Sequence, residues 1–303
     1  MSVADEAKKC VAFLATANAT GGDVILGCTA FIVSVPISEK SDKVALYVVT
    51  VRHHSDKLKG KKFGVRLNTK AGDAATIWFN EDHRWHLHPS EPDEVDAAAL
   101  CLGNDDLSAF DFLHIPRSMF LTDELIKNAA IGAGDNVFMT GLFTRLKGKR
   151  NTPIVRAGNI AAMPKERVTT SLCGKLVESE AYLTEMRSMG GISGSPVFAR
   201  ETIVTYDTRA SQWGKNSQIP LFHVGPLYLL GLMHGQWTIR PEEQNKSDFR
   251  QSKPHEDESI ALGIAVVVPA KKILEILDQP ELIEQRKELD RLERESLGGT
   301  SCI

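Results

Sequence analysis

Residues 189–198, MGGISGSPVF, hold a serine whose neighbours leave its side chain open. Gly194 follows Ser193 and Gly191 lies two residues before it. Glycine lets a backbone adopt positive φ and lets another molecule approach closely. Such a serine is either a structural turn residue or a nucleophile, and a nucleophile needs a base and an orienting acid elsewhere in the chain.

Two histidines, His53 and His54, come directly after an apolar run at 47–51. A neutral imidazole can take the proton of a serine and later return it to a leaving group, because it titrates near neutral pH. At the end of a strand, one of these rings would face a cleft. The alternative is that both are surface histidines in a polar turn.

Asp96 stands at the start of a second apolar run, EVDAAALCL at 94–102. An aspartate that leads a buried strand is, in one interpretation, a cap or turn residue. In the other it sits beside a histidine, fixes its tautomer and stabilises the imidazolium that forms. The candidates then follow one another in the order His53, Asp96, Ser193.

These segments together resemble the chymotrypsin-like (trypsin-fold) serine protease superfamily. Thr50 stands three residues before His53, as in the Thr-x-x-His signature of that family. The segment DAAAL at 96–100 resembles its Asp-x-Ala-x-Leu motif, and GISGSP at 191–196 resembles Gly-Asp-Ser-Gly-Gly-Pro. Each motif alone is weak, and the three in this order are fairly specific.

Two further segments are similar to the HtrA-like branch of the superfamily. GAGDNVFMTG at 132–141 resembles the opening of its second barrel, and residues 262–277 resemble its last strand, proline and terminal helix. The resemblance covers roughly residues 9–278, and no PDZ-like domain is expected after it.

The resemblance implies an all-β serine endopeptidase of two packed six-stranded antiparallel β-barrels with a C-terminal helix. Residues 9–118 would form the barrel that carries the histidine and the aspartate, and residues 119–278 the barrel that carries the serine. A charged helical tail, 279–303, would follow. Ser193 would attack a carbonyl while His53 takes its proton, and the backbone N–H groups of Ser193 and Gly191 would bind the oxyanion.

The chain departs from the secreted members of the family at Ile192, where they carry an aspartate that pairs with a newly cleaved N-terminus. Activation by N-terminal cleavage is therefore not expected. The oxyanion loop would be formed constitutively or ordered by a ligand or partner.

Substrate preference rests on four residues placed by the same resemblance. Arg187 would lie at the base of the first substrate pocket, where a guanidinium favours an acidic side chain before the scissile bond; the alternative is that it faces solvent. His234 would lie near the strand that lines this pocket, adding positive character or serving as a wall residue. Gly235 and Gln236 would lie where the substrate backbone docks as an added strand.

The elements that must position these residues are mostly strands. Short β-rich runs separated by Gly, Asn, Asp and Pro recur along the chain with few helical stretches between them, which is typical of a sandwich or barrel. The expected strands lie at 11–17, 23–35, 43–51, 63–68, 76–80, 95–102, 135–143, 152–163, 195–199, 203–207, 227–233 and 261–269.

Helical periodicity is strongest at 269–297. Pro280 is expected to divide this segment into a helix that packs on the barrel and a highly charged second helix. The second helix is either a solvated surface element or a docking or oligomerisation helix. The polar stretch 240–259 is expected to be an exposed loop.

The composition is that of an ordinary globular protein. The 303 residues carry a net charge of −3, with 42% hydrophobic and 25% charged residues, which does not indicate a nucleic-acid or anionic-membrane surface. No apolar run reaches the length of a membrane span, and the N-terminal sequence does not resemble a secretory signal. The scattered cysteines favour neither a disulfide framework nor a zinc site, so a cytoplasmic location is predicted. They are Cys10, Cys28, Cys101, Cys173 and Cys302.

Two other classes of function were weighed. In an α/β-hydrolase the Gly-x-Ser-x-Gly pattern would require glycine at Ser195, and strands would alternate with helices. A latent or inactive protease fold that serves as a binding or scaffold module is the stronger alternative.

No cofactor or metal is predicted. His86 and His88 alternate onto one face of a strand but lack an acidic or cysteine partner at ligand spacing, so they are expected to be surface residues near the loop before Asp96. The expected partner is a protein or peptide substrate. A regulatory protein partner is expected only from the need to restrain a cytoplasmic protease, and no nucleic acid or membrane partner is expected.

Overall fold

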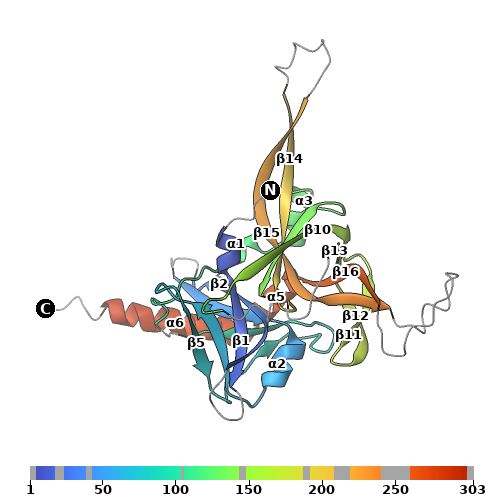
Figure 1. The fold of residues 1–303 in the computed structure, drawn as a ribbon. Helices are drawn as coiled ribbons and strands as arrows, with labels where there is room; N and C mark the ends of the chain where they lie inside the picture. The colour runs from blue at the N-terminus through green and yellow to red at the C-terminus, as the bar shows by residue number, and fades with distance from the viewer. Residues whose placement is uncertain are drawn as a thin grey trace.

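The computed structural model describes residues 5–17, 24–38, 43–103, 106–142, 148–186, 192–207, 219–239 and 260–298 (Figure 1). These residues are mostly strand, as the β-rich runs predict. The first half comprises α1 (Asp5–Lys9), β1 (Val11–Ala17), β2 (Val24–Pro36), β3 (Val44–Thr50), α2 (Arg52–Leu58), β4 (Phe63–Asn68), β5 (Ala74–Phe79), β6 (His86–Leu87), β7 (Ala98–Cys101) and β8 (Ile115–Pro116).

The second half begins with the short helices η1 (Arg117–Met119) and α3 (Asp123–Asn128). Strands β9 (Asn136–Leu142), β10 (Pro153–Ala162), β11 (Arg167–Leu172), β12 (Lys175–Glu180), β13 (Tyr182–Glu185), β14 (Pro196–Asp207), β15 (Ile219–Ile239) and β16 (Ile260–Pro269) follow. The chain ends with α5 (Ala270–Leu277) and α6 (Pro280–Gly298).

The N-terminal strands form one open sheet in the order β5-β4-β1-β2-β3-β7-β6, with β8 paired to β2. A closed six-stranded barrel was predicted here, and it is not found. The strand β6 has two residues, both paired to β7, so little backbone is left to bond with β5 at the other edge. Aromatic side chains pack near these edges instead. The ring centroid of Phe63 lies 5.3 Å from that of Phe79 and 5.6 Å from that of Trp85.

The C-terminal strands close into a six-stranded antiparallel barrel in the order β10-β13-β16-β15-β14-β9. This barrel agrees with the prediction for the second half of the chain. The hairpin of β14 and β15 continues well beyond it, because β14 pairs with β9 only over Val197–Ala199 (Figure 1). The core of the barrel is apolar and includes Ile192, Val197, Leu230 and Met233.

One apolar cluster joins the sheet, the barrel and the C-terminal helices. It brings together buried residues such as Phe31 and Tyr47 of the sheet, Phe198 and Leu232 of the barrel, and Ile273 of α5. Two of the candidate site residues, Asp96 of the first half and His234 of β15, lie in contact where the sheet and the barrel meet.

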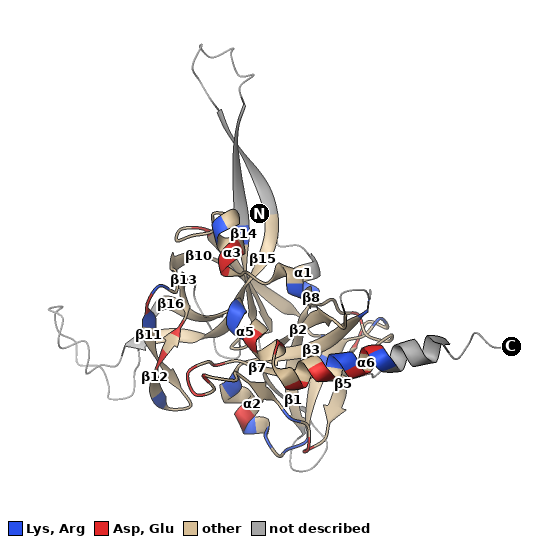
Figure 2. Cartoon of the chain, turned by 180° about the vertical axis from the view of Figure 1, so that it is seen from behind, with Lys and Arg blue, Asp and Glu red and all other residues tan. Residues whose placement is uncertain are grey.

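The C-terminal segment breaks where the proline predicts, since α5 ends at Leu277 and α6 begins at Pro280. The first half of α6 docks on the chain itself (Figure 2). Leu282 is fully buried, and the buried Arg286 guanidinium donates to the Tyr47 hydroxyl at 2.9 Å. Among the described residues, no helix is long and apolar enough to cross a bilayer.

Candidate active site

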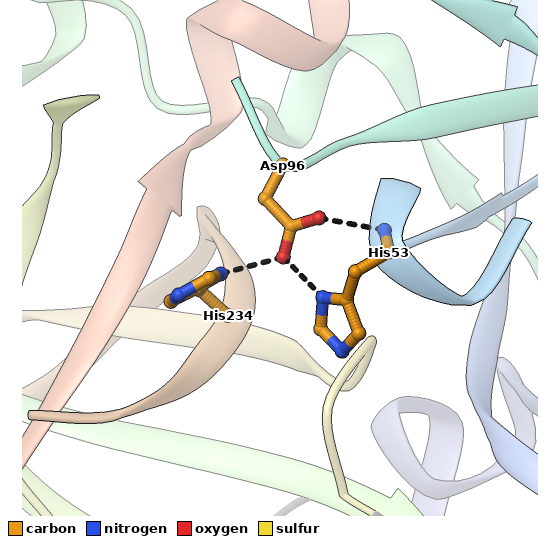
Figure 3. A group of neighbouring side chains, drawn as sticks. All are labelled: His53, Asp96 and His234. Carbon is orange, nitrogen blue, oxygen red and sulfur yellow. Dashed lines mark hydrogen bonds and ion pairs between the residues drawn. The ribbon is translucent and has the colours of Figure 1, made fainter. Parts of the chain in front are cut away.

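His53 and Asp96 form a hydrogen-bonded pair at the start of α2 (Figure 3). The backbone N–H of His53 donates to Asp96 Oδ1 at 2.9 Å, and its ring Nδ1 lies 2.7 Å from Asp96 Oδ2. The first N–H groups of a helix lack partners within the helix, so Asp96 satisfies one of them while it orients the ring. One carboxylate thus fixes both the backbone and the side chain of His53.

Asp96 precedes β7 and is 3% exposed. Burial alone would raise the pKa of its carboxyl, but hydrogen bonds from His234 and His53 outweigh burial and hold this pKa well below its usual range. The group is therefore ionised at neutral pH and acts as an acceptor only.

His234 of β15 is the second donor to this carboxylate. Its Nδ1 lies 2.5 Å from Asp96 Oδ2, and its Nε2 lies 3.1 Å from the hydroxyl of Thr170 in β11. The sequence predicts His234 near the strand that lines the first substrate pocket, where it would add positive character or serve as a wall residue. The structure places it beside the candidate acid, with both ring nitrogens in hydrogen bonds.

The side chains of His53, Asp96 and His234 are of the kinds that bind zinc, and their nearest ligand atoms lie within 4.8 Å of one another. Two ligand atoms on one tetrahedral zinc ion lie roughly 3.3 Å apart, given Zn–N and Zn–O lengths of about 2.0–2.1 Å. The separations of 2.5 and 2.7 Å found here are those of hydrogen bonds.

His54, the other histidine of the pair, does not contact Asp96 through any hydrogen bond found among the described residues. Its ring lies 4.5 Å from that of His53, and burial, followed by the nearby His53, lowers its pKa to about 4. Of the two, His53 therefore has the contacts of a catalytic base.

The turn at Ile192–Ser195 carries Ser193, which is half-buried. Gly194 has a φ of +89°, and a Cβ there would come within 2.0 Å of the Thr29 carbonyl oxygen and 2.7 Å of Thr50 Oγ1. Its N–H donates to the Met233 carbonyl at 2.9 Å. Thr50 lies three residues before His53, and Met233 lies one residue before His234. Because Gly194 is close to both Thr50 and Met233, the serine turn lies beside the histidine–aspartate group.

Ser195 has a structural role in the same turn. It is fully buried, and its hydroxyl donates to the Ile192 carbonyl at 2.6 Å. Among the residues that the structure describes, Ser193 makes no such contact, which leaves it as the candidate nucleophile. The hydrogen bonds found among the described residues do not include one from Ser193 to His53; in free enzymes such bonds are often long and tighten when substrate binds.

A groove of about 670 Å³ opens beside His53 and His234. Its other wall includes the turn of the β11–β12 hairpin, where Cys173 and Gly174 have φ values of +51° and +80°, as two-residue hairpin turns require. Sequence reasoning did not place this hairpin at the site. The signal that would have found it is two short runs, RVTTSL and KLVESE, separated by the two residues Cys-Gly.

The predicted specificity and oxyanion positions other than His234 and Ser193 divide into two groups. Arg187 and Gly191 lie outside the described residues. Gly235 and Gln236 lie in β15 and pair with β16, at Val266 and Ala265. A Cβ on Gly235 would meet nothing within 4 Å, so space is open beside this part of the strand.

His86 and His88 are buried, so the prediction that they are surface residues is wrong. His88 accepts the backbone N–H of Glu91 on Nδ1 at 3.0 Å, and its Nε2 lies 2.7 Å from Glu275 of α5. A buried imidazole needs such partners, and here a backbone N–H three residues away and a carboxylate 187 residues away supply them.

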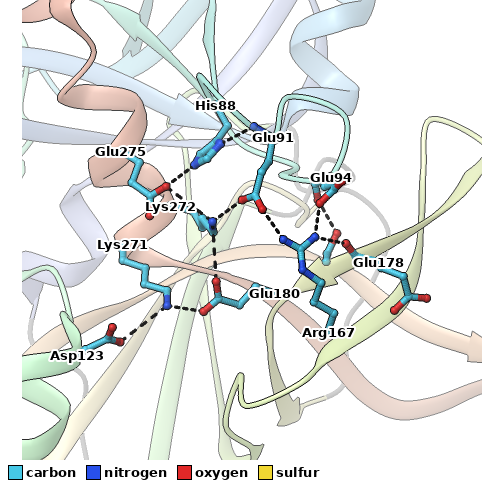
Figure 4. Close-up of polar contacts among 11 residues, drawn as sticks. His88, Glu91, Glu94, Asp123, Arg167, Glu178, Glu180, Lys271, Lys272 and Glu275 are labelled. Carbon is cyan, nitrogen blue, oxygen red and sulfur yellow. Dashed lines mark hydrogen bonds and ion pairs between the residues drawn. The ribbon is translucent and has the colours of Figure 1, made fainter.

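The loop that leads to Asp96 is held by a network of ion pairs (Figure 4). Lys272 of α5 contacts Glu91, and Arg167 of β11 contacts Glu91 and Glu94. The Lys272 hydrogen bond is the main reason that the pKa of Glu91 lies below its usual value. The network fastens the candidate acid's loop to both α5 and the β11–β12 hairpin.

Comparisons with known proteins give no family. No protein-family description matches the chain, and no curated protein matches it. A crystal structure of Rv3671c from M. tuberculosis H37Rv, a serine-to-alanine mutant in its inactive form, is similar at 15% sequence identity and a TM-score of 0.41. The match covers 89% of this chain and 87% of the other. The function proposed below therefore rests on the geometry of the site.

Proposed function

We propose that the protein is a serine endopeptidase with a trypsin-like His53–Asp96–Ser193 triad. The observation that carries the proposal is the buried, ionised Asp96 that binds both the backbone N–H and the Nδ1 of His53. This arrangement leaves Nε2 as the unprotonated nitrogen, which is the state a general base needs. The serine turn beside it supports Ser193 as the nucleophile.

In the proposed mechanism, Ser193 Oγ attacks the carbonyl of a peptide bond while His53 Nε2 takes the hydroxyl proton. The imidazolium that forms is stabilised by Asp96 and then protonates the leaving amine. Water repeats the sequence to release the acyl group. The N–H groups of Ser193 and Gly191 would bind the oxyanion, and removing one such donor typically costs on the order of 10²–10³ in rate.

Activation without N-terminal cleavage is part of the proposal. Ile192 is fully buried in the apolar core of the barrel, so it anchors the serine turn by packing. A carboxylate that pairs with a new N-terminus is therefore not needed at this position to hold the turn.

Substrate binding is proposed along Gly235 and Gln236, with the groove beside His53 as the entrance. A preference for acidic side chains before the scissile bond rests on Arg187 and is tested by Arg187→Asp. That variant should lose cleavage after Glu and Asp in a peptide library, and an unchanged preference would remove Arg187 from the pocket. The cytoplasmic location and a regulatory protein partner remain hypotheses from the sequence.

The test is intact-mass analysis after treatment with a fluorophosphonate. The wild type and Ser195→Ala should each gain one adduct, and Ser193→Ala should gain none. An adduct on Ser193→Ala would refute the assignment of the nucleophile. Folded wild type without an adduct would instead favour the alternative, a latent or inactive protease fold that serves as a binding module.

A further inference from the structure

His234 shares the candidate acid with His53 and is more enclosed than His53. Its side chain is 10% exposed, its ring stands at 85° to that of His53, and the two ring centroids are 5.9 Å apart (Figure 3). A single carboxylate oxygen, Asp96 Oδ2, accepts from both rings. The position of this oxygen therefore determines which nitrogen of each ring carries a proton.

The tautomers follow from the hydrogen-bond network. Ionised Asp96 can only accept, so the nitrogen that each ring turns toward it must carry a proton. Both histidines are then Nδ1–H tautomers when neutral. Nε2 of His234 is left as an acceptor, and the Thr170 hydroxyl at 3.1 Å is the group that can donate to it.

The neutral state of His234 matters for the proposed reaction. When His53 becomes an imidazolium, a second positive ring on the same carboxylate would oppose the charge that forms. A neutral His234 instead donates to Asp96 without competing for its charge. A hydroxyl that donates to Nε2 favours this neutral tautomer.

Thr170 belongs to the β11–β12 hairpin, which also binds the loop before Asp96. Arg167 of β11 forms an ion pair with Glu94, and the Ser179 hydroxyl of β12 donates to the Glu94 carbonyl. Glu94 lies two residues before Asp96 in the chain. The hairpin therefore contacts the region of Asp96 in two ways. It binds Glu94 in the loop before Asp96, and its Thr170 binds His234, which in turn binds Asp96.

We propose that His234 is a positioning residue for Asp96 and that Thr170 holds it in the tautomer this role requires. The inference rests on the proposed function, since it names a further residue of the same site. In this arrangement the β11–β12 hairpin is the outer support of the catalytic acid: a shift of the hairpin that breaks the Thr170 contact releases His234 and loosens the carboxylate that orients His53.

Two substitutions of His234 separate its two nitrogens. In His234→Asn the amide nitrogen takes the place of Nδ1 and can still donate to Asp96. In His234→Gln the amide takes the place of Nε2, so the Thr170 contact is kept and the donor to Asp96 is lost. We expect kcat for a peptide substrate to fall about 10- to 100-fold in the Gln variant, the usual size for a hydrogen bond to a charged group. The Asn variant should retain most of the activity, and KM should change little in either.

Substitutions in β11 test the outer contact. Thr170→Val removes the hydroxyl that faces His234 and should lower kcat several-fold. Thr169→Val is the matched control, because Thr169 lies on the same strand, is exposed and contacts Glu178 on the other face. It should leave kcat unchanged.

Nitrogen NMR of ring-labelled histidine gives a readout that does not depend on activity. Wild type at neutral pH should show His53 and His234 as Nδ1–H tautomers with slowly exchanging Nδ1 protons. Full activity in the Gln variant, an Asn variant as impaired as the Gln variant, or a wild-type His234 protonated on Nε2 would each overturn the inference. If Ser193 fails to label while both Nδ1 protons are found, the proposed function fails and the His234–Asp96 contact stands. If His234→Gln does not fold, the wild-type NMR spectrum and the comparison of kcat between Thr170→Val and Thr169→Val test the inference instead.

Discussion

Asp96→Asn is the sharpest test of the site because the surrounding donors leave an amide without a good orientation. Asp96 Oδ1 faces the His53 backbone N–H, and Oδ2 faces the Nδ1 atoms of His53 and His234. A backbone N–H cannot change from donor to acceptor, so the asparagine oxygen should turn toward it. The NH₂ group then faces both rings, and each ring must move its proton to Nε2.

The rate loss follows from that tautomer. With a proton on Nε2, His53 cannot accept one from Ser193. The opposite amide orientation leaves the NH₂ group against the backbone N–H, two buried donors without an acceptor, at a cost of about 2–6 kcal/mol. Each ~1.36 kcal/mol is a factor of ten in rate, and the charge that stabilises the imidazolium is also lost. Together these effects predict a fall in kcat on the order of 10⁴-fold, the size found when a triad aspartate is replaced by asparagine.

The assay is steady-state hydrolysis of a peptide or ester substrate, with circular dichroism and denaturant unfolding to establish that the variant is folded. Asp93→Asn is the matched control, because Asp93 lies three residues earlier and its side chain is 87% exposed. That control should keep its kcat. A folded Asp96→Asn protein that retains more than about a tenth of wild-type kcat would refute the tautomer argument.

The other predictions concern stability. Gly194→Ala places a methyl group against a backbone carbonyl at positive φ, so the free energy of unfolding in urea should fall by about 2–4 kcal/mol. Gly174→Ala, which has a positive φ but open space, should cost only about 1 kcal/mol, and equal losses would show that the collision is unimportant. Ser195→Ala should lower the same free energy by about 1 kcal/mol through its lost hydrogen bond; no loss would mean that the hydroxyl does not hold the turn. The pKa of His54 is lower when folded than its ordinary value of 6.5, so the unfolded chain binds more protons between pH 6.5 and about 4, and stability should fall as pH drops through this window. His54→Gln should flatten that part of the curve and His83→Gln, at an exposed position, should not; parallel curves for wild type and His54→Gln would contradict the shift.

The strand pattern predicted most strands of the second half, and the proline predicted the break at Pro280, because both signals act locally. The closed barrel was implied by the family resemblance. Neither predicted the open first sheet. Whether the edge strands close depends on the length of β6 and on the packing of Phe63, Phe79 and Trp85, which are contacts between elements that strand periodicity does not encode.

The same limit applies to the site. His53 and Asp96 were found from short motifs, and the structure places them in contact. The place of His234 was missed because its partners, Asp96 and Thr170, are 138 and 64 residues away and no local pattern records them. Burial of His88 was missed for the same reason, since Glu275 comes from the other end of the chain. The positions of Arg187 and Gly191 and the boundaries at 118 and 278 stay predictions.

The docking of α6 on the N-terminal sheet has a consequence for biosynthesis. Arg286 contacts Tyr47 across 239 residues, and Asp290 accepts from Ser38 across 252 residues. Contacts between such distant segments form late, because the loop between them must first be closed. During translation the sheet that carries His53 and Asp96 is synthesised long before α6, which packs against Tyr47 of that sheet. The nascent chain therefore exposes the surface beneath α6 until the α6 segment has left the ribosome, and that interval is when a chaperone or a second nascent chain would meet it.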